Sequence, residues 1–150
     1  MSIKERLEED IRHAMRARDQ ERLDALRFLK SQIQLVEKNN LKELDEAGVV
    51  DVVAKQVKDR RESIQMFSDG GRDDLVAQET AALAVVQEYL PEQLGVAELE
   101  ALARQAIADL GATGLSDRGK VMGRIMPQVR GKADGGDVNA VVARLLETAG

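Results

Sequence analysis

Residues 19–40 read DQERLDALRFLKSQIQLVEKNN, and this stretch decides the fold class. Its apolar residues recur every three or four positions, which is the spacing that places side chains on one face of an α-helix. They are Leu23, Leu26, Leu29, Ile33 and Val36. Asp19 precedes them, where a carboxylate can accept hydrogen bonds from the free N–H groups of a helix start. The stretch therefore predicts one long amphipathic helix that ends near Asn39 and Asn40.

The same periodicity continues towards the N-terminus. Ser2 and Glu5 have the spacing of a capping box, in which each side chain accepts a hydrogen bond from the backbone amide of the other residue. The apolar residues that follow share one face and are Ile3, Leu7, Ile11, Ala14 and Met15. A first helix is therefore predicted before the long one.

Two further helices are predicted between residues 45 and 90. Asp45 can cap the third helix, which ends at Asp69-Gly70-Gly71 and whose inward residues are Val49, Val53, Val57, Ile64 and Phe67. The fourth runs from about Asp73 to Leu90, with Val76, Leu83, Val86 and Leu90 inward. Because the loops are short, neighbouring helices are expected to be antiparallel.

The composition of the chain changes near residue 95. Nine of the twelve glycines lie from Gly95 onward, whereas all three aromatic residues lie before it. Residues 1–95 contain 15 basic and 20 acidic side chains, a net charge of −5, while residues 96–150 contain 7 of each. Pro91 lies at the change and disfavours helix at the residue before it. We predict two domains, 1–92 and 93–150.

The second domain is predicted to contain three shorter helices. One covers residues 96–110 and is followed by Gly111, which suits the left-handed position after a helix end. Ser116 or Asp117 caps the next, which runs towards Arg130, and Asp137 caps the last. No segment alternates between apolar and polar residues as a strand would. The fold class is therefore all-α, an antiparallel four-helix domain followed by a small three-helix domain.

The residue types limit the chemistry that this chain can perform. It has no cysteine, which excludes disulfides, iron–sulfur clusters and thiolate zinc sites. Its one histidine, His13, is predicted on the solvent face of the first helix. No serine lies in a nucleophile motif, and no glycine-rich nucleotide loop is present. We therefore expect no catalytic residue, no metal and no cofactor, and a stand-alone enzyme is the least favoured hypothesis.

Charge and hydropathy also limit the partners. The longest apolar run, from Ala81 to Val86, is far shorter than the roughly 20 residues of a membrane span. The N-terminus is charged from its first residues and does not look like a signal peptide, so a cytoplasmic chain without a membrane partner is expected. A net charge of −5 and only three aromatic residues disfavour bulk nucleic-acid binding and base stacking.

Two charged residues interrupt the apolar faces of the third and fourth helices. Arg60 lies within the apolar stripe of the third helix, and Glu79 lies within that of the fourth. The turn at Gly70-Gly71 brings them nearly level in an antiparallel hairpin. We expect a partly buried, bidentate ion pair that fixes the register of the two helices. The alternative is that Arg60 and Glu79 form a catalytic or ligand-binding pair.

Residues 115–132 are basic in an otherwise acidic chain, with five basic residues and one acid. Lys120 and Arg124 are four residues apart and share a helix face, opposite Met122 and Met126. Gly119 and Gly123 beside them would let a phosphate backbone approach closely. The segment suits contact with phosphates, although solvated cations and helix-ending glycines would give the same pattern.

Two other features extend this basic segment. Pro127 is expected to end or kink the helix after Met126, and so to orient Arg130 and Lys132 separately. The next helix begins near Gly135-Gly136-Asp137, whose unpaired amides could attract an anion.

Arg12, Arg16 and Arg22 could form another basic face on the first two helices. Residues 4–30 interleave seven acidic with eight basic side chains, so ordinary pairing along the helix surfaces is the better account.

Several motifs together resemble the YqeY family over essentially the whole chain. The N-terminal signature comprises Lys58-Asp59-Arg60-Arg61-Glu62-Ser63-Ile64, Phe67 and Gly71-Arg72-Asp73-Asp74-Leu75. The junction motif is Tyr89-Leu90-Pro91-Glu92-Gln93-Leu94, and the C-terminal motifs are Gly119-Lys120-Val121-Met122 and Gly131-Lys132-Ala133-Asp134-Gly135. The chain departs from the family at Gly95, where a serine or threonine cap is usual.

This resemblance implies a two-domain helical protein whose C-terminal domain is similar to the tail of GatB. GatB is the subunit of the tRNA-dependent glutamine amidotransferase whose tail engages tRNA, and its catalytic cradle has no counterpart in this sequence. The family's tail motif falls on Gly119, Lys120, Met122, Gly131, Lys132, Asp134 and Gly135, of which the glycines, Met122 and Asp134 have backbone or structural roles. The resemblance implies tRNA contact by Lys120, Arg124, Arg130 and Lys132.

The resulting hypothesis is a non-catalytic tRNA-binding or accessory protein. The alternatives are an accessory protein that docks on amidotransferase or synthetase subunits, or a carbon–nitrogen ligase with glutamine as amido-N-donor that acts only with partner subunits.

Overall fold

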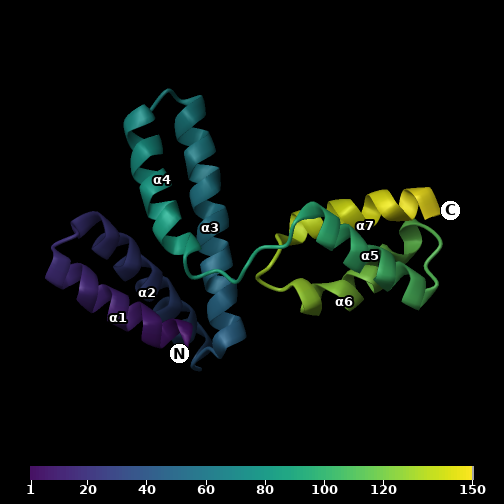
Figure 1. Ribbon diagram of the computed structural model, residues 1–150, viewed down its shortest axis with the longest axis horizontal. Helices are drawn as coiled ribbons and strands as arrows, with labels where there is room; N and C mark the ends of the chain where they lie inside the picture. The colour runs from purple at the N-terminus through teal and green to yellow at the C-terminus, as the bar shows by residue number, and fades with distance from the viewer. Residues whose placement is uncertain (150) are drawn as a thin grey trace. The chain divides into compact units, whose positions relative to one another are not determined.

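The computed structural model describes residues 1–149, which form helices joined by short connections (Figure 1). It contains seven α-helices, one short 3-10 helix and, among these residues, no strand. The helices are α1 (Ile3–Ala17), α2 (Gln20–Asn40), α3 (Glu46–Asp69), α4 (Asp73–Gln87), α5 (Val96–Leu110), the 3-10 helix η1 (Leu115–Asp117), α6 (Arg118–Val129) and α7 (Gly135–Ala149). The all-α prediction is confirmed.

Contacts within the chain divide it into two compact units. Unit 1 comprises Met1–Leu90 and contains α1 to α4, while unit 2 begins at Pro91 and contains α5 to α7. The predicted boundary lay two residues later, between residues 92 and 93.

The first three helices begin at side-chain caps that the sequence predicted. Ser2 Oγ accepts a hydrogen bond from the Glu5 amide at 3.1 Å, and Asp45 Oδ1 accepts one from the Gly48 amide at 2.8 Å. Asp19 Oδ1 caps α2 in the same way. Arg18 and Leu41, after α1 and α2, both adopt the left-handed conformation, with φ of 55° and 52°.

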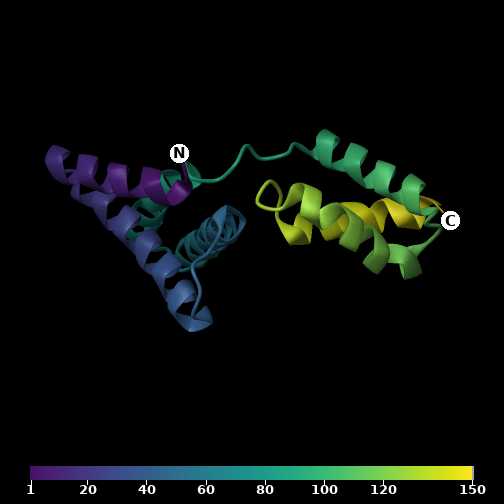
Figure 2. The same ribbon diagram turned by 90° about the horizontal axis from the view of Figure 1, so that it is seen from below.

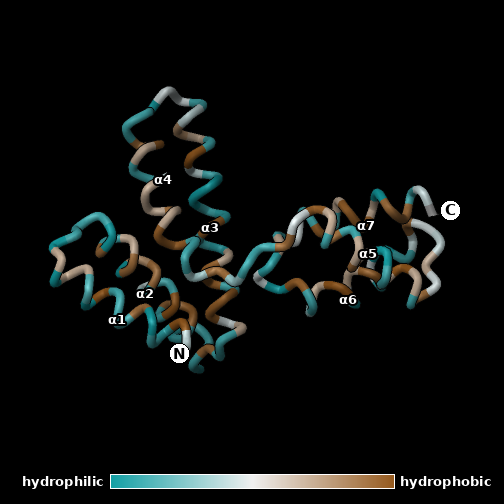
Figure 3. The backbone as a smooth tube through the Cα atoms, in the orientation of Figure 1, coloured by the Kyte–Doolittle hydropathy of each residue, from teal (hydrophilic) through white to brown (hydrophobic). Residues whose placement is uncertain are grey.

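The core of unit 1 lies among all four helices. Its buried residues are Leu7, Ile11, Ala14, Leu23, Leu26, Leu29, Ile33, Val49, Val52, Val53, Val57, Val86 and Tyr89. The tube of Figure 3 shows such apolar residues in brown along α1, α2 and the lower part of α3. Met15, predicted on this face, is instead 51% exposed. It lies about 80° around the helix from Leu7, at the edge of the apolar stripe and near the end of α1.

The fourth helix ends three residues earlier than predicted, at Gln87. The reason is that Leu90 precedes Pro91, and a proline disfavours the helical conformation at the residue before it. Tyr89 is nonetheless buried in the unit 1 core, where its hydroxyl donates a hydrogen bond to Asp10 and the Arg6 guanidinium lies 4.5 Å from its ring centroid. Arg22 on α2 also pairs with Glu88, at 2.7 Å. These contacts hold the end of α4 against α1 and α2.

Unit 2 is a three-helix arrangement in which α5, α6 and α7 contact one another (Figure 2). Its buried residues are Leu99, Ala103, Ala106, Val121, Ile125, Val129, Val138, Val142, Leu145 and Leu146. Gly111 occupies the predicted left-handed position after α5, with φ of 61°. No helix within residues 1–149 is long and apolar enough to cross a membrane.

Two caps predicted in unit 2 are wrong. Neither Ser116 nor Asp117 gives α6 a side-chain cap, because Asp117 Oδ2 accepts the Thr113 amide at 3.0 Å. The last helix begins at Gly135, so Asp137 lies inside its first turn. Asp134 takes the capping role, since its Oδ2 accepts the Gly136 amide at 3.1 Å and its carbonyl accepts the Val138 amide.

Pro127 does not end α6, which continues to Val129. A proline inside a helix removes one hydrogen bond and crowds the carbonyl four residues earlier. That residue is Gly123, which is exposed, so water can solvate the carbonyl that Pro127 leaves without a donor.

Candidate nucleic-acid interface

The basic segment of unit 2 is organised by α6 and the turn that follows it. The apolar stripe of α6 is Val121, Ile125 and Val129, all fully buried in the unit 2 core. With this stripe directed inward, Lys120 and Arg124 lie on the exposed side of the helix. Met122 and Met126 pack against the core, as the sequence predicted for the opposite face.

The same exposed side carries two glycines that have no packing reason to be glycine. A Cβ atom added at Gly119 or Gly123 would meet nothing within 4 Å. Both residues lie in an α-helix, where glycine is less favourable than alanine. The helix therefore presents bare backbone beside Lys120 and Arg124, which would let a phosphate group approach closely.

The cations of the segment differ in their partners. Within the described residues, the side chains of Lys120 and Lys132 make no ion pair or hydrogen bond. Arg124 lies 3.6 Å from Asp109 of α5 in an exposed ion pair. Exposed pairs of this kind contribute only about 0–1 kcal/mol, so Arg124 can exchange Asp109 for a phosphate at small cost. Arg130 is exposed where the chain leaves α6.

The turn after α6 is built on Gly131, which has φ of 76°. Its carbonyl accepts a hydrogen bond from Gln93 Nε2 at 2.8 Å, and the Lys132 carbonyl accepts the Leu94 amide, also at 2.8 Å. Two residues of the junction motif thus hold the backbone of Gly131 and Lys132. The role of Gln93 was not predicted from the sequence, because nothing local to residue 93 signals a partner 38 residues away.

The start of α7 is not the open anion site that the sequence suggested. The Asp134 carboxylate accepts the Gly136 amide and so occupies the helix N-terminus. Gly135 begins the helix, and a Cβ there would lie 3.8 Å from Met126 Cε in ordinary contact. A phosphate at this helix start would be repelled by the carboxylate already present.

Arg60 and Glu79 lie together on the facing sides of α3 and α4. Arg60 Nη1 donates a hydrogen bond to Glu79 Oε2 at 3.1 Å, and the side chains are 13% and 25% exposed. Arg60 Nε, which a bidentate pair could use, is buried without a partner. The guanidinium also lies 5.4 Å from the ring centroid of Phe28 on α2.

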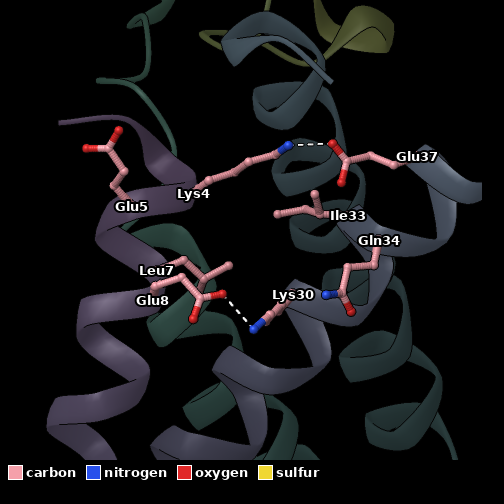
Figure 4. Close-up of a pocket in the computed structure, with 8 residues that line it drawn as sticks. All are labelled: Lys4, Glu5, Leu7, Glu8, Lys30, Ile33, Gln34 and Glu37. Atoms are coloured by element: carbon pink, nitrogen blue, oxygen red, sulfur yellow. Dashed lines mark hydrogen bonds and ion pairs between the residues drawn. The ribbon is translucent and has the colours of Figure 1, made fainter. Parts of the chain in front are cut away.

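The cavity between α1 and α2 has a volume of about 280 Å³ and shows no catalytic arrangement (Figure 4). Leu7 and Ile33 contribute apolar walls. Four of its five charged side chains already pair, Lys4 with Glu37 and Lys30 with Glu8, and the fifth is Glu5. The hydrogen bond from Lys4 holds the pKa of Glu37 below its usual value.

Residues 1–149 contain no group of three acidic or histidine side chains placed to hold a metal ion. His13 is exposed, as predicted.

These features define a class of two-unit helical proteins whose second unit presents a locally basic, glycine-containing helix face. A comparison with family models identifies the family of the chain. Residues 4–146 match the model described as "Yqey-like protein". The chain therefore belongs to the YqeY-like family, as its motifs predicted.

Curated relatives support the same family. The chain is 32% identical over 130 residues to "Altered inheritance of mitochondria protein 41, mitochondrial" of Pyrenophora tritici-repentis, covering 85% of this chain and 71% of that protein. It is 38% identical over 105 residues to the protein of the same name in Eremothecium gossypii, covering 69% and 57%. The second alignment thus spans little more than half of the relative. Because both relatives are named as mitochondrial, the cytoplasmic location of this chain stays a prediction.

Proposed function

We propose that this chain is a non-catalytic RNA-binding accessory protein whose second unit contacts tRNA phosphates through Lys120, Arg124, Arg130 and Lys132. The observation that carries the proposal is the charge of residues 115–132, five cations with a single acid. That acid, Asp117, is directed to the Thr113 amide.

The exposed face of α6 suits phosphates better than bases. All three aromatic residues precede Gly95, so unit 2 has no aromatic side chain on which a base could stack. Its cations and bare helix backbone can instead contact the sugar–phosphate chain by charge and shape. The resemblance of this unit to the tail of GatB points to tRNA as the RNA class.

The test is binding of tRNA to the full chain across a range of salt concentrations. Each phosphate contact contributes about 0.7–0.9 to the slope of log affinity against log salt, so replacing the four cations by alanine should lower that slope by roughly 3. A matched control replaces Lys38, Lys42, Lys58 and Arg61 in unit 1, which are exposed and make no ion pair among the described residues. Equal binding by wild type and the unit 2 variant would refute the proposal.

A second proposal is docking on amidotransferase or synthetase subunits through unit 1. The whole excess of negative charge, −5, belongs to residues 1–95, and this charge disfavours RNA over most of that surface. Amidation of aminoacyl-tRNA by the partner enzyme is the readout, and no change on adding excess protein would count against docking. The carbon–nitrogen ligase alternative requires the partner to supply all the catalytic groups.

A further inference from the structure

Three arginines lie at or near the turn between α1 and α2. They belong to unit 1 and take no part in the RNA contact that we propose for unit 2. Arg12, Arg16 and Arg18 are exposed, and their side chains make no hydrogen bond or ion pair among the described residues. The predicted pairing of Arg12 and Arg16 with acidic neighbours is therefore wrong. Arg22, which the sequence grouped with them, is held instead by Glu88.

The charge around this turn differs from that of the rest of unit 1. Residues 11–18 contain three arginines and no acidic residue, within a segment, 1–95, whose net charge is −5. The next acid along the chain, Asp19, caps α2 by accepting the Arg22 amide. Figure 3 shows the turn between the two helices as mostly hydrophilic. Residues 11–18 are thus locally positive, as residues 115–132 are in unit 2, although acidic residues flank them at positions 8–10 and at Asp19 and Glu21.

The backbone at Arg18 adds a second observation. It closes α1 in the left-handed conformation, with φ of 55° and ψ of 36°. Glycine adopts this conformation without the clash of a Cβ atom, and Gly111 fills the equivalent position after α5. An arginine at this position carries a conformational penalty that glycine would avoid, as Leu41 does after α2.

The apolar residues of α1 argue against a membrane as the partner. Leu7, Ile11 and Ala14 are buried in the unit 1 core, and Met15 is the one large apolar residue near the turn that is well exposed. A helix that lies in a membrane surface needs a continuous apolar face directed outward. Arginine guanidinium groups, in contrast, bind phosphate oxygens in a planar, two-pronged geometry.

We propose that Arg12, Arg16 and Arg18 form a second phosphate-binding surface for the same RNA, so that each unit contributes one basic contact. This proposal rests on the proposed RNA binding by unit 2. The two units follow each other directly in the chain at Leu90 and Pro91, and two weak contacts held in one chain bind one RNA more tightly than either alone when both can be made together.

The experiment measures binding of fluorescently labelled tRNA to the full chain by anisotropy, at several salt concentrations. Replacing Arg12, Arg16 and Arg18 by glutamine should lower the salt slope by about 2 and weaken binding about tenfold at low salt. The matched control, with Lys38, Lys42 and Lys58 changed to glutamine, removes the same charge and should retain most of the affinity.

Arg18→Gly separates binding from stability. It should raise the melting temperature, because glycine relieves the left-handed strain, and yet weaken tRNA binding. If Arg12, Arg16 and Arg18 serve only to complement the negative end of the α1 dipole, their replacement lowers stability and leaves tRNA binding unchanged. That result would overturn the proposal.

The remaining outcomes separate the two proposals. If the Arg12, Arg16 and Arg18 variant binds tRNA as well as its control while the unit 2 variant does not, the second surface is refuted and the contact by unit 2 survives. If the reverse holds, the contact by unit 2 is refuted, and so is the proposal that each unit contributes one basic contact. Binding of wild type to phosphatidylserine vesicles without binding to tRNA would overturn both.

Discussion

The ion pair between Arg60 and Glu79 gives the most specific prediction about stability. The hydrogen bond of 3.1 Å joins a guanidinium that is 13% exposed to a carboxylate that is 25% exposed. Exposed ion pairs contribute about 0–1 kcal/mol, whereas breaking a buried pair costs about 3–5 kcal/mol. Because the Arg60–Glu79 pair is partly buried, the cost of breaking it should lie between these two values.

The expected free energies of unfolding follow from what each substitution leaves behind. Glu79→Leu leaves Arg60 buried without its partner and should cost about 2–3 kcal/mol, while Arg60→Met leaves a better hydrated carboxylate and should cost about 1 kcal/mol. The double variant replaces both charges by apolar groups and should lie within about 1 kcal/mol of wild type, because Arg60 Nε no longer remains buried without a partner. The magnitude of the coupling free energy is then at least about 2 kcal/mol.

Urea unfolding monitored by tyrosine fluorescence measures this coupling in unit 1 alone. Tyr89 is the only tyrosine, the chain has no tryptophan, and Tyr89 is buried in the unit 1 core. The exposed pair of Lys55 and Asp59, also on α3, is the control and should show a coupling of about 0.3–0.5 kcal/mol. A coupling between Arg60 and Glu79 no larger than that of the control would refute the reasoning.

Two further predictions concern Tyr89 and the glycines of α6. Burial, and then the hydrogen bond to Asp10, raise the pKa of Tyr89 above its ordinary 10.0, so its contribution to stability is complete below pH 10 and is lost as the pH rises further. Urea unfolding followed by circular dichroism should show this loss in wild type, and a Tyr89→Phe variant with the same loss would contradict it. Gly123→Ala and Gly119→Ala should each stabilise unit 2 by about 0.5–1 kcal/mol, since nothing lies within 4 Å of the added Cβ. Both substitutions should also weaken the binding of tRNA. An unchanged affinity would show that no phosphate approaches the helix backbone at Gly119 or Gly123.

The candidate interface was partly predictable from sequence. The spacing of Val121, Ile125 and Val129 fixes which side of α6 is buried, and therefore that Lys120 and Arg124 are exposed. The cap of α7 was not predictable, because Asp134 and Asp137 are both acceptable caps and the path of the turn at Gly131 decides between them.

Long-range partners were harder to predict than exposure. Glu79 was identified as the partner of Arg60 only because a tight turn at Gly70 and Gly71 sets the two helices level. The hydrogen bonds that Gln93 makes to Gly131, and Leu94 to Lys132, connect segments separated by whole helices, and no local pattern marks them.

The sequence by itself determined the helices, their buried faces and most of their caps, because these depend on residues within about four positions of one another, and its motifs identified the family. Only the tertiary structure decided which cations keep a partner. Arg22 finds Glu88, 66 residues away, whereas Arg12 and Arg16 find no acid among the described residues although acidic residues are frequent nearby in the sequence. Ion pairs form where packed helices bring charges within reach, and that distance is set by the core rather than by the order of residues along the chain.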